Sequence, residues 1–284
     1  MLFLQKTGNW LEYRLIYFGV SFMDLYNQRF GGIERLYGEQ QLTFLKRAHV
    51  CVVGIGGVGS WTAEALARSG VGKITLIDLD DICVTNTNRQ IHALTDTVGQ
   101  NKVDVMAQRI KLINPDCEVH PIMDFVTDKN VAEYLKDFAY VVDATDSVKA
   151  KAAMINHCKR QKIPVITVGG AGGQVDPTQI TVGDLAKTTQ DPLAAKLRSF
   201  LRRFYGFSQN TKRRFGVECV YSTEQLRYPD AKGNVSYAKQ MTGGVKLDCS
   251  GGFGAAVTVT ATFGLVTASR VINKLIEKNF TQIK

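Results

Sequence analysis

Short apolar runs alternate with segments of helical periodicity through most of the chain. Four apolar runs are expected to form buried strands, at residues 49–53, 73–78, 139–144 and 164–168. Three segments with one apolar face are expected to form helices, at residues 60–69, 102–113 and 148–161. Helices that alternate with strands in this way return the chain to the start of a new parallel strand. The pattern therefore predicts an α/β fold with a doubly wound, mainly parallel sheet of the Rossmann-like kind.

The rhythm changes at the glycine cluster of residues 169–173, which precedes a further strand expected at residues 179–182. We expect residues 23–284 to form a single domain. Its Rossmann-like core is placed at about 45–170, and a C-terminal extension carries a basic substrate-binding region at about 183–250. Residues 1–22 are interpreted as an N-terminal extension upstream of a candidate translation start at Met23.

The last long apolar segment, residues 253–272, has no charged residue before Arg270 and is about as long as a membrane span. It also contains glycines, threonines and a serine, which suit a helix packed closely against a sheet. We therefore expect a buried helix here and no membrane partner.

A glycine-rich segment joins the first expected strand to the first expected helix, and it reads Gly54-Ile55-Gly56-Gly57-Val58-Gly59-Ser60. Glycines let the backbone turn sharply and approach an anion, while a helix N-terminus offers unpaired N–H groups. The candidate nucleotide-binding residues are therefore Gly54, Gly56, Gly57, Gly59 and Ser60. Asp78 lies where a ribose-binding carboxylate is expected. These residues alone leave a nicotinamide dinucleotide and ATP as alternatives.

The chain of 284 residues carries a formal net charge of +9, which favours an anionic partner such as nucleic acid. Eight lysines or arginines and one acid lie between Lys187 and Phe215, so this region alone contributes +7. The six cysteines form no Cys-x-x-Cys pair. We therefore expect no zinc, and a reduced, cytoplasmic setting.

Three polar clusters follow the glycine-rich segment, at residues 86–90, 99–103 and 143–146. A dehydrogenase has no need of the first cluster. Together the set resembles the ATP-dependent adenylating superfamily of the ThiF, MoeB and HesA type, which includes ubiquitin-activating enzymes and the bacterial activators of sulfur-carrier proteins. The resemblance implies a Rossmann-like ATP-binding fold.

Adenylation brings a carboxylate to the α-phosphate of ATP and expels pyrophosphate, so negative charge must be neutralised in the site. Arg89 and Lys102 are expected to supply this charge, and Asn86 to donate a hydrogen bond to a phosphate. Asp146 is expected to hold Mg²⁺ together with ATP, since Mg²⁺ prefers carboxylate and phosphate oxygens. Asp78 is expected to bind the ribose hydroxyls, with Asp80 as a further ATP-binding candidate.

Several of these assignments have a structural alternative. Arg89 and Lys102 are also typical of solvated surface charges. Asp146 is also suited to cap the helix expected from residue 148, and Asp80 and Asp81 to cap or solvate a turn.

Further motifs narrow the resemblance to one branch. They are Arg29-Phe30-Gly31-Gly32, Asp176-Pro177-Thr178-Gln179-Ile180, Gln190-Asp191-Pro192-Leu193-Ala194-Ala195-Lys196-Leu197-Arg198 and Gly252-Phe253-Gly254-Ala255-Ala256. With these, the chain from Met23 onward is similar to the tRNA threonylcarbamoyladenosine dehydratases.

This resemblance implies that ATP activates the threonyl carboxylate of a modified adenosine beside the tRNA anticodon. The neighbouring carbamoyl group then attacks to close a ring and releases AMP. Because the nucleophile belongs to the substrate, neither Cys219 nor Cys249 needs a catalytic role. A homodimer is also implied, in which Arg29 or Arg35 reaches the partner subunit's ATP.

The basic region suits an RNA substrate, and Arg202, Arg203, Arg213 and Arg214 are the candidate tRNA-binding residues. Interleaved aromatics can stack on unpaired bases, and they are Phe200, Phe204, Tyr205, Phe207 and Phe215. The alternative is an amphipathic helix with a solvated basic face and its aromatics in the core.

Three other functions remain open at this point. The main enzymatic alternative is an activator of a ubiquitin-like or sulfur-carrier protein, although the paired cysteines usual in sulfur-carrier activators are absent. A nicotinamide oxidoreductase and a non-catalytic RNA-binding protein are further alternatives. A sulfur-transfer protein is a candidate partner.

Overall fold

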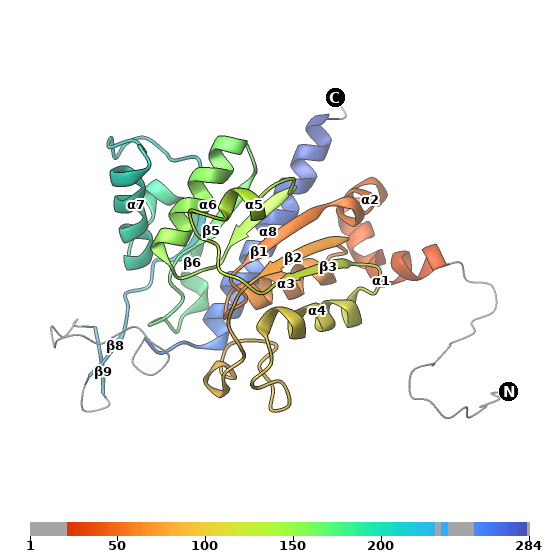
Figure 1. The fold of residues 1–284 in the computed structure, drawn as a ribbon, viewed down its shortest axis with the longest axis horizontal. Helices are drawn as coiled ribbons and strands as arrows, with labels where there is room; N and C mark the ends of the chain where they lie inside the picture. Colours follow the sequence, from red (N-terminus) through yellow and green to blue (C-terminus); the bar gives the residue numbers. More distant parts are fainter. Residues whose placement is uncertain (1–21, 231–233, 238–252, 283–284) are drawn as a thin grey trace.

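The computed structural model describes residues 22–230, 234–237 and 253–282 (Figure 1). The N-terminal extension before residue 22, Cys249 and part of the basic region therefore lie outside the described residues.

The centre of the fold is a seven-stranded sheet with the strand order β3-β2-β1-β4-β5-β7-β6. The strands are β1 (His49–Val53), β2 (Lys73–Ile77), β3 (Glu118–Ile122), β4 (Tyr140–Asp143), β5 (Val165–Val168), β6 (Ile180–Asp184) and β7 (Glu218–Ser222). Neighbouring strands are parallel except for β6 and β7, which are antiparallel. The predicted doubly wound, mainly parallel sheet is thus confirmed.

Helices cover both faces of this sheet (Figure 1). They are α1 (Phe22–Tyr37), α2 (Glu39–Arg47), α3 (Gly59–Arg68), α4 (Lys102–Ile113), α5 (Val131–Tyr134), α6 (Val148–Gln161), α7 (Pro192–Phe204) and α8 (Val257–Gln282). Short 3₁₀ turns span Val84–Asn86, Pro177–Gln179 and Leu185–Lys187, and a small hairpin pairs β8 (Tyr228–Pro229) with β9 (Val235–Ser236). The three helices expected in the core match α3, α4 and α6 to within one residue at each end.

The side chains of β1 point alternately to the two faces of the sheet, which explains why helices cover both. Val50 and Val52 are buried in a core that includes residues of α3, α4 and α8. Cys51 and Val53 point to the opposite face, where they share a core with Met154 of α6. Because successive side chains of a strand face opposite sides, an uninterrupted apolar strand requires helices on both.

The long C-terminal helix α8 packs against α3, where the Thr62 hydroxyl donates to the Gly264 carbonyl at 3.2 Å. Val259, Phe263 and Val271 of α8 are fully buried in the main core. The buried helix expected at residues 253–272 is therefore present, but it begins at Val257. Within the part of the chain that the structure describes, no helix has both the length and the apolarity needed to cross a bilayer.

Candidate active site

The glycine-rich loop leaves β1 at the point where the strand order changes direction. Its neighbours β2 and β4 lie on either side of β1, so the carboxyl ends of β1 and β4 form the switch point, where open α/β sheets bind their ligands. Gly54 has a φ of +87°, and a Cβ there would lie 2.8 Å from the Ala144 carbonyl. A Cβ at Gly59 would overlap the Gly54 carbonyl oxygen. Only glycines therefore allow this loop to lie against the segment that follows β4.

Helix α3 begins in this loop with Val58 as its N-cap, and no side chain in the described structure caps it. The first N–H groups of an uncapped helix form an anion site. Two buried oxygens beside the loop, Ser60 Oγ and Gln90 Oε1, have no hydrogen-bond partner among the described residues. Orphaned buried polar atoms cost about 1–3 kcal/mol each, so the loop fits a bound polar group such as a nucleotide.

Asp78 follows β2, beside the loop. Its Oδ2 accepts the Ile55 N–H at 2.6 Å, and its Oδ1 accepts the Asp80 N–H at 2.9 Å. Burial raises the pKa of Asp78, while the charge of Lys102 and the two N–H donors oppose that rise. Two backbone N–H groups thus hold the carboxylate beside the loop, and its contact with a ribose stays a prediction.

Lys102 opens α4 and is almost fully buried. Its Nζ lies 2.8 Å from Asp80 Oδ2 and 3.9 Å from Asp78 Oδ1. It is therefore not a solvated surface lysine. Asp80 is exposed at its carboxylate and orients the lysine, a contact that the sequence did not predict.

Asn86 and Arg89 come from the turn that follows Asp81. Asn86 is buried, and its Oδ1 accepts the Cys83 N–H at 3.0 Å, which orients the amide nitrogen as a donor. Arg89 Nη1 donates to the Thr85 carbonyl and to Asn88 Oδ1, both at 2.9 Å. A Cβ at Gly57 would lie 3.3 Å from Arg89 Cγ, so the stem of the arginine lies over the glycine-rich loop.

Asp146 lies two residues beyond Ala144, which contacts the loop at Gly54 and Gly59. The side chain of Ser147, not of Asp146, caps α6 by accepting the Ala150 N–H. Asp146 is exposed and free of the capping role that the sequence left open. An exposed carboxylate beside a phosphate loop fits Mg²⁺ held jointly with phosphate oxygens.

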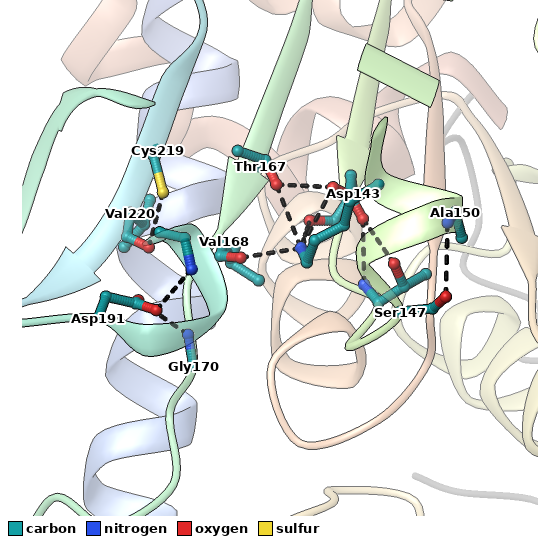
Figure 2. A network of polar contacts seen from close by, with 12 residues as sticks. Asp143, Ser147, Ala150, Thr167, Val168, Gly170, Asp191, Cys219 and Val220 are labelled. Atoms are coloured by element: carbon teal, nitrogen blue, oxygen red, sulfur yellow. Dashed lines mark hydrogen bonds and ion pairs between the residues drawn. The ribbon is translucent and has the colours of Figure 1, made fainter. Parts of the chain in front are cut away.

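A buried ion pair that the sequence did not indicate lies at the carboxyl ends of β4 and β5 (Figure 2). Lys151 and Asp143 are both fully buried, with Lys151 Nζ 3.2 Å from Asp143 Oδ2. The same amine donates to Thr167 Oγ1 at 3.1 Å and to the Val168 carbonyl at 2.8 Å. Asp143 Oδ1 in turn accepts the Thr145 hydroxyl at 2.8 Å. The pair thereby fixes the segment that carries Asp146.

Asp191 is a second buried carboxylate that the sequence did not single out. Its Oδ2 accepts the Gly170 N–H at 2.9 Å, and its Oδ1 accepts the Ala194 N–H at 2.8 Å (Figure 2). It thus caps α7 and ties the start of that helix to the glycine cluster after β5.

His92 is also buried close to the site, and both its ring nitrogens lack a hydrogen-bond partner within the described residues. Burial lowers its pKa to about 4, and the charges of Lys102 and Arg109 act in the same direction. The ring is therefore neutral at neutral pH and adds no positive charge to the site.

The candidate tRNA-binding arginines do not share one environment. Arg203, Arg213 and Arg214 are exposed. Arg202 is partly buried, with its guanidinium 5.2 Å from the Phe215 ring centre and its Nε donating to the Ser208 carbonyl. Phe215 is only 5% exposed and belongs to the core, so it is not available for base stacking.

Cys219 is fully buried on β7, and burial raises the pKa of its thiol far above the ordinary value. A thiol in that state is not a nucleophile. Arg29 lies on α1 and donates to the Ile113 carbonyl of its own chain at 3.4 Å, whereas Arg35 is exposed on the last turn.

Comparison with known proteins gives a consistent result. The model of the ThiF family matches residues 30–284. A tRNA threonylcarbamoyladenosine dehydratase of Escherichia coli is 59% identical over 261 residues, which cover 91% of this chain and 97% of that protein. Another of that name, from Haemophilus influenzae, is 56% identical, with 90% of this chain and 96% of that protein covered.

A solved structure shows the same fold. The crystal structure of the Escherichia coli tRNA N6-threonylcarbamoyladenosine dehydratase in complex with ATP superposes with a TM-score of 0.82 and 56% identity. The match covers 93% of this chain and 100% of that one.

Proposed function

The chain belongs to the ThiF family and, within it, to the tRNA threonylcarbamoyladenosine dehydratases, and from this premise we propose the reaction it performs. The protein dehydrates threonylcarbamoyladenosine next to the tRNA anticodon in an ATP-dependent reaction. One observation carries the proposal: the glycine-rich loop, Arg89 and the segment before Asp146 meet at the switch point of the sheet. That edge of the sheet offers the charges needed by a reacting triphosphate.

The reaction has two bond exchanges. First, the threonyl carboxylate attacks the α-phosphorus of ATP, and pyrophosphate leaves. The carbamoyl group of the same nucleoside then attacks the acyl carbon, and AMP leaves with one former carboxylate oxygen. The product is cyclic threonylcarbamoyladenosine, which has lost the elements of one water molecule. An internal nucleophile supplies proximity without an enzyme thiol, in keeping with the inert environment of Cys219.

The residues around the switch point have different roles in this reaction. The first N–H groups of α3 and the loop of Gly54, Gly56, Gly57 and Gly59 hold phosphate oxygens, with Ser60 beneath them. Asp78 binds the ribose. Lys102 and Arg89 neutralise the charge that develops on the phosphates, and Asn86 donates a hydrogen bond to them. Asp146 would hold Mg²⁺, which screens the triphosphate when bound.

Several features of the assembly are also part of the proposal. Arg203, Arg213 and Arg214 bind the tRNA backbone, and Arg202 supports them from its partly buried position. The enzyme acts in the cytoplasm as a homodimer, in which Arg29 or Arg35 serves the partner's site. A sulfur-transfer protein is an additional partner.

The proposal is tested by incubating the protein with ATP, Mg²⁺ and tRNA that carries the linear modification. We expect AMP and pyrophosphate to form in step with loss of one water from the modified nucleoside, detected by mass spectrometry after mild digestion. Unmodified tRNA is the matched control and should release neither. Pyrophosphate release with a diglycine-tailed carrier protein, and none with modified tRNA, would instead establish the activator of a protein substrate.

A further inference from the structure

A groove of about 600 Å³ lies between α6 and α7 on the molecular surface. Its lining includes Lys149 from the first turn of α6 and Lys196, Phe200, Arg203 and Phe204 from α7. Three of the described lining residues are cationic and none is acidic. The groove is therefore complementary in charge to a polyanion.

The spacing of residues along α7 explains which of its side chains line the groove. Its lining positions recur at Lys196, Phe200 and Arg203, which a helix of 3.6 residues per turn brings to one face. The opposite face is buried through Ala194, Leu197 and Leu201. Lys196, Arg203 and Phe204 are thus exposed on the side of α7 that does not build the core, and the half-buried Phe200 links that side to the core.

Both walls of the groove begin near the carboxyl edge of the sheet, where β4 and β5 end. Lys149 lies three residues after Asp146 on the segment held by Asp143 and Lys151. The start of α7 is tied through Asp191 to Gly170 (Figure 2). A strand of a substrate bound along the groove therefore leads directly to the catalytic edge of the sheet.

Phe204 is 58% exposed at the far end of the groove, which is unusual for a phenylalanine in a well-packed helix. Its ring centre lies 4.5 Å from that of Phe200, and the Arg203 guanidinium lies 5.0 Å from the ring centre. Unpaired bases stack on aromatic rings and on guanidinium planes. The exposed ring of Phe204 and the Arg203 guanidinium thus offer surfaces on which a base can stack.

We propose that the groove between α6 and α7 binds the unpaired anticodon-loop strand beside the modified adenosine, with phosphates on Lys149 and Lys196 and a base stacked on Phe204. The inference rests on the proposed function for the identity of the RNA. Ala195 and Phe204 are nine residues apart on α7, so the helix rises roughly 14 Å between them. Four stacked nucleotides of a single strand extend over about the same distance. Lys149, Lys196 and Phe204 thereby extend the tRNA site beyond the four arginines.

The test is direct binding of a fluorescent anticodon stem-loop, measured by anisotropy without ATP over a range of salt concentrations. Phe204→Leu removes the ring but keeps an apolar side chain, and we expect affinity to fall roughly tenfold. Lys149→Ala with Lys196→Ala should reduce the slope of log affinity against log salt by about 1.4. ATP affinity should be unchanged in both variants.

Matched controls are Phe125→Leu, another exposed phenylalanine, and Lys111→Ala on α4, both away from the groove. Both should bind the stem-loop like the parent protein. Stem-loop affinity and salt slope that stay at parent values in the groove variants would overturn the proposal. Binding of an acidic peptide that these variants abolish, with RNA binding intact, would assign the groove to a protein partner instead. The binding assay contains no ATP and needs no reaction. A failure of the groove to bind RNA can therefore be told apart from a failure of the protein to dehydrate the modified nucleoside.

Discussion

Replacing Lys102 by alanine should lower the rate of AMP formation on modified tRNA by roughly 10³-fold. Lys102 Nζ is buried beside Asp78 and Asp80, close to the glycine-rich loop, so its charge acts where water screens it little. A neutral methyl group in its place leaves the charge of the reacting phosphates uncompensated. Single-turnover AMP formation, with ATP and tRNA both saturating, measures the effect.

The control is Lys111→Ala, which removes an exposed lysine near the other end of the same helix. Its rate should stay within twofold of the parent. Circular dichroism must show that Lys102→Ala remains folded, because its ion pairs are lost as well. If the folded variant kept at least a tenth of the parent rate, Lys102 would have no major role in the adenylation step.

Replacing Lys151 by methionine should lower the free energy of unfolding by about 3–5 kcal/mol. Lys151 and Asp143 are both fully buried, and the amine also satisfies Thr167 Oγ1 and the Val168 carbonyl. Methionine fills a similar volume but leaves the Asp143 carboxylate without its charge partner in the protein interior. Urea unfolding followed by circular dichroism at neutral pH measures the loss.

Two further variants separate this charge effect from general damage to α6. Lys149→Ala removes an exposed lysine two residues earlier and should change the free energy of unfolding by less than about 0.5 kcal/mol. Adding Asp143→Asn to Lys151→Met removes the unpaired charge and should recover part of the lost stability. A loss below about 1 kcal/mol for Lys151→Met alone would show that the buried pair is not a major stabilising element.

Much of the sheet was predictable because its central strands are mostly apolar. β1, β4 and β5 are buried on both faces, and only parallel strands between two helix layers have that pattern. The inner strand β7 was not predicted, and neither was the edge strand β3. Strand β3 contains His120 and Pro121 and is largely exposed, so no apolar run marks it. Its pairing with β2 depends on tertiary context.

The parts of the site that depend on short spacings along the chain could be predicted. Contacts between residues far apart in the sequence could not. The glycine-rich loop and the position of Asp78 follow from a strand-to-helix turn. The contact of Lys102 with Asp80 joins residues 22 positions apart, and no local pattern indicates it.

Lys151 could have been found, because it falls on the same helical stripe as Met154, Ile155 and Cys158, all buried. A lysine on an apolar stripe needs a buried acid, and Asp143 is the acid at the end of the preceding strand. The sequence did not show which aromatics of the basic region are exposed. Phe204 and Phe215 both lie among basic residues, but Phe204 is exposed and Phe215 is buried.

In the proposed reaction, ATP adenylates the carboxylate of the modified adenosine. The measurement that tests it most directly uses tRNA whose threonyl carboxylate carries heavy oxygen in both positions. Adenylation followed by ring closure leaves one heavy oxygen in AMP and one in the cyclic nucleoside, and mass spectrometry of both products detects this. Unlabelled AMP, or heavy oxygen in inorganic phosphate with ADP as the nucleotide product, would contradict the account.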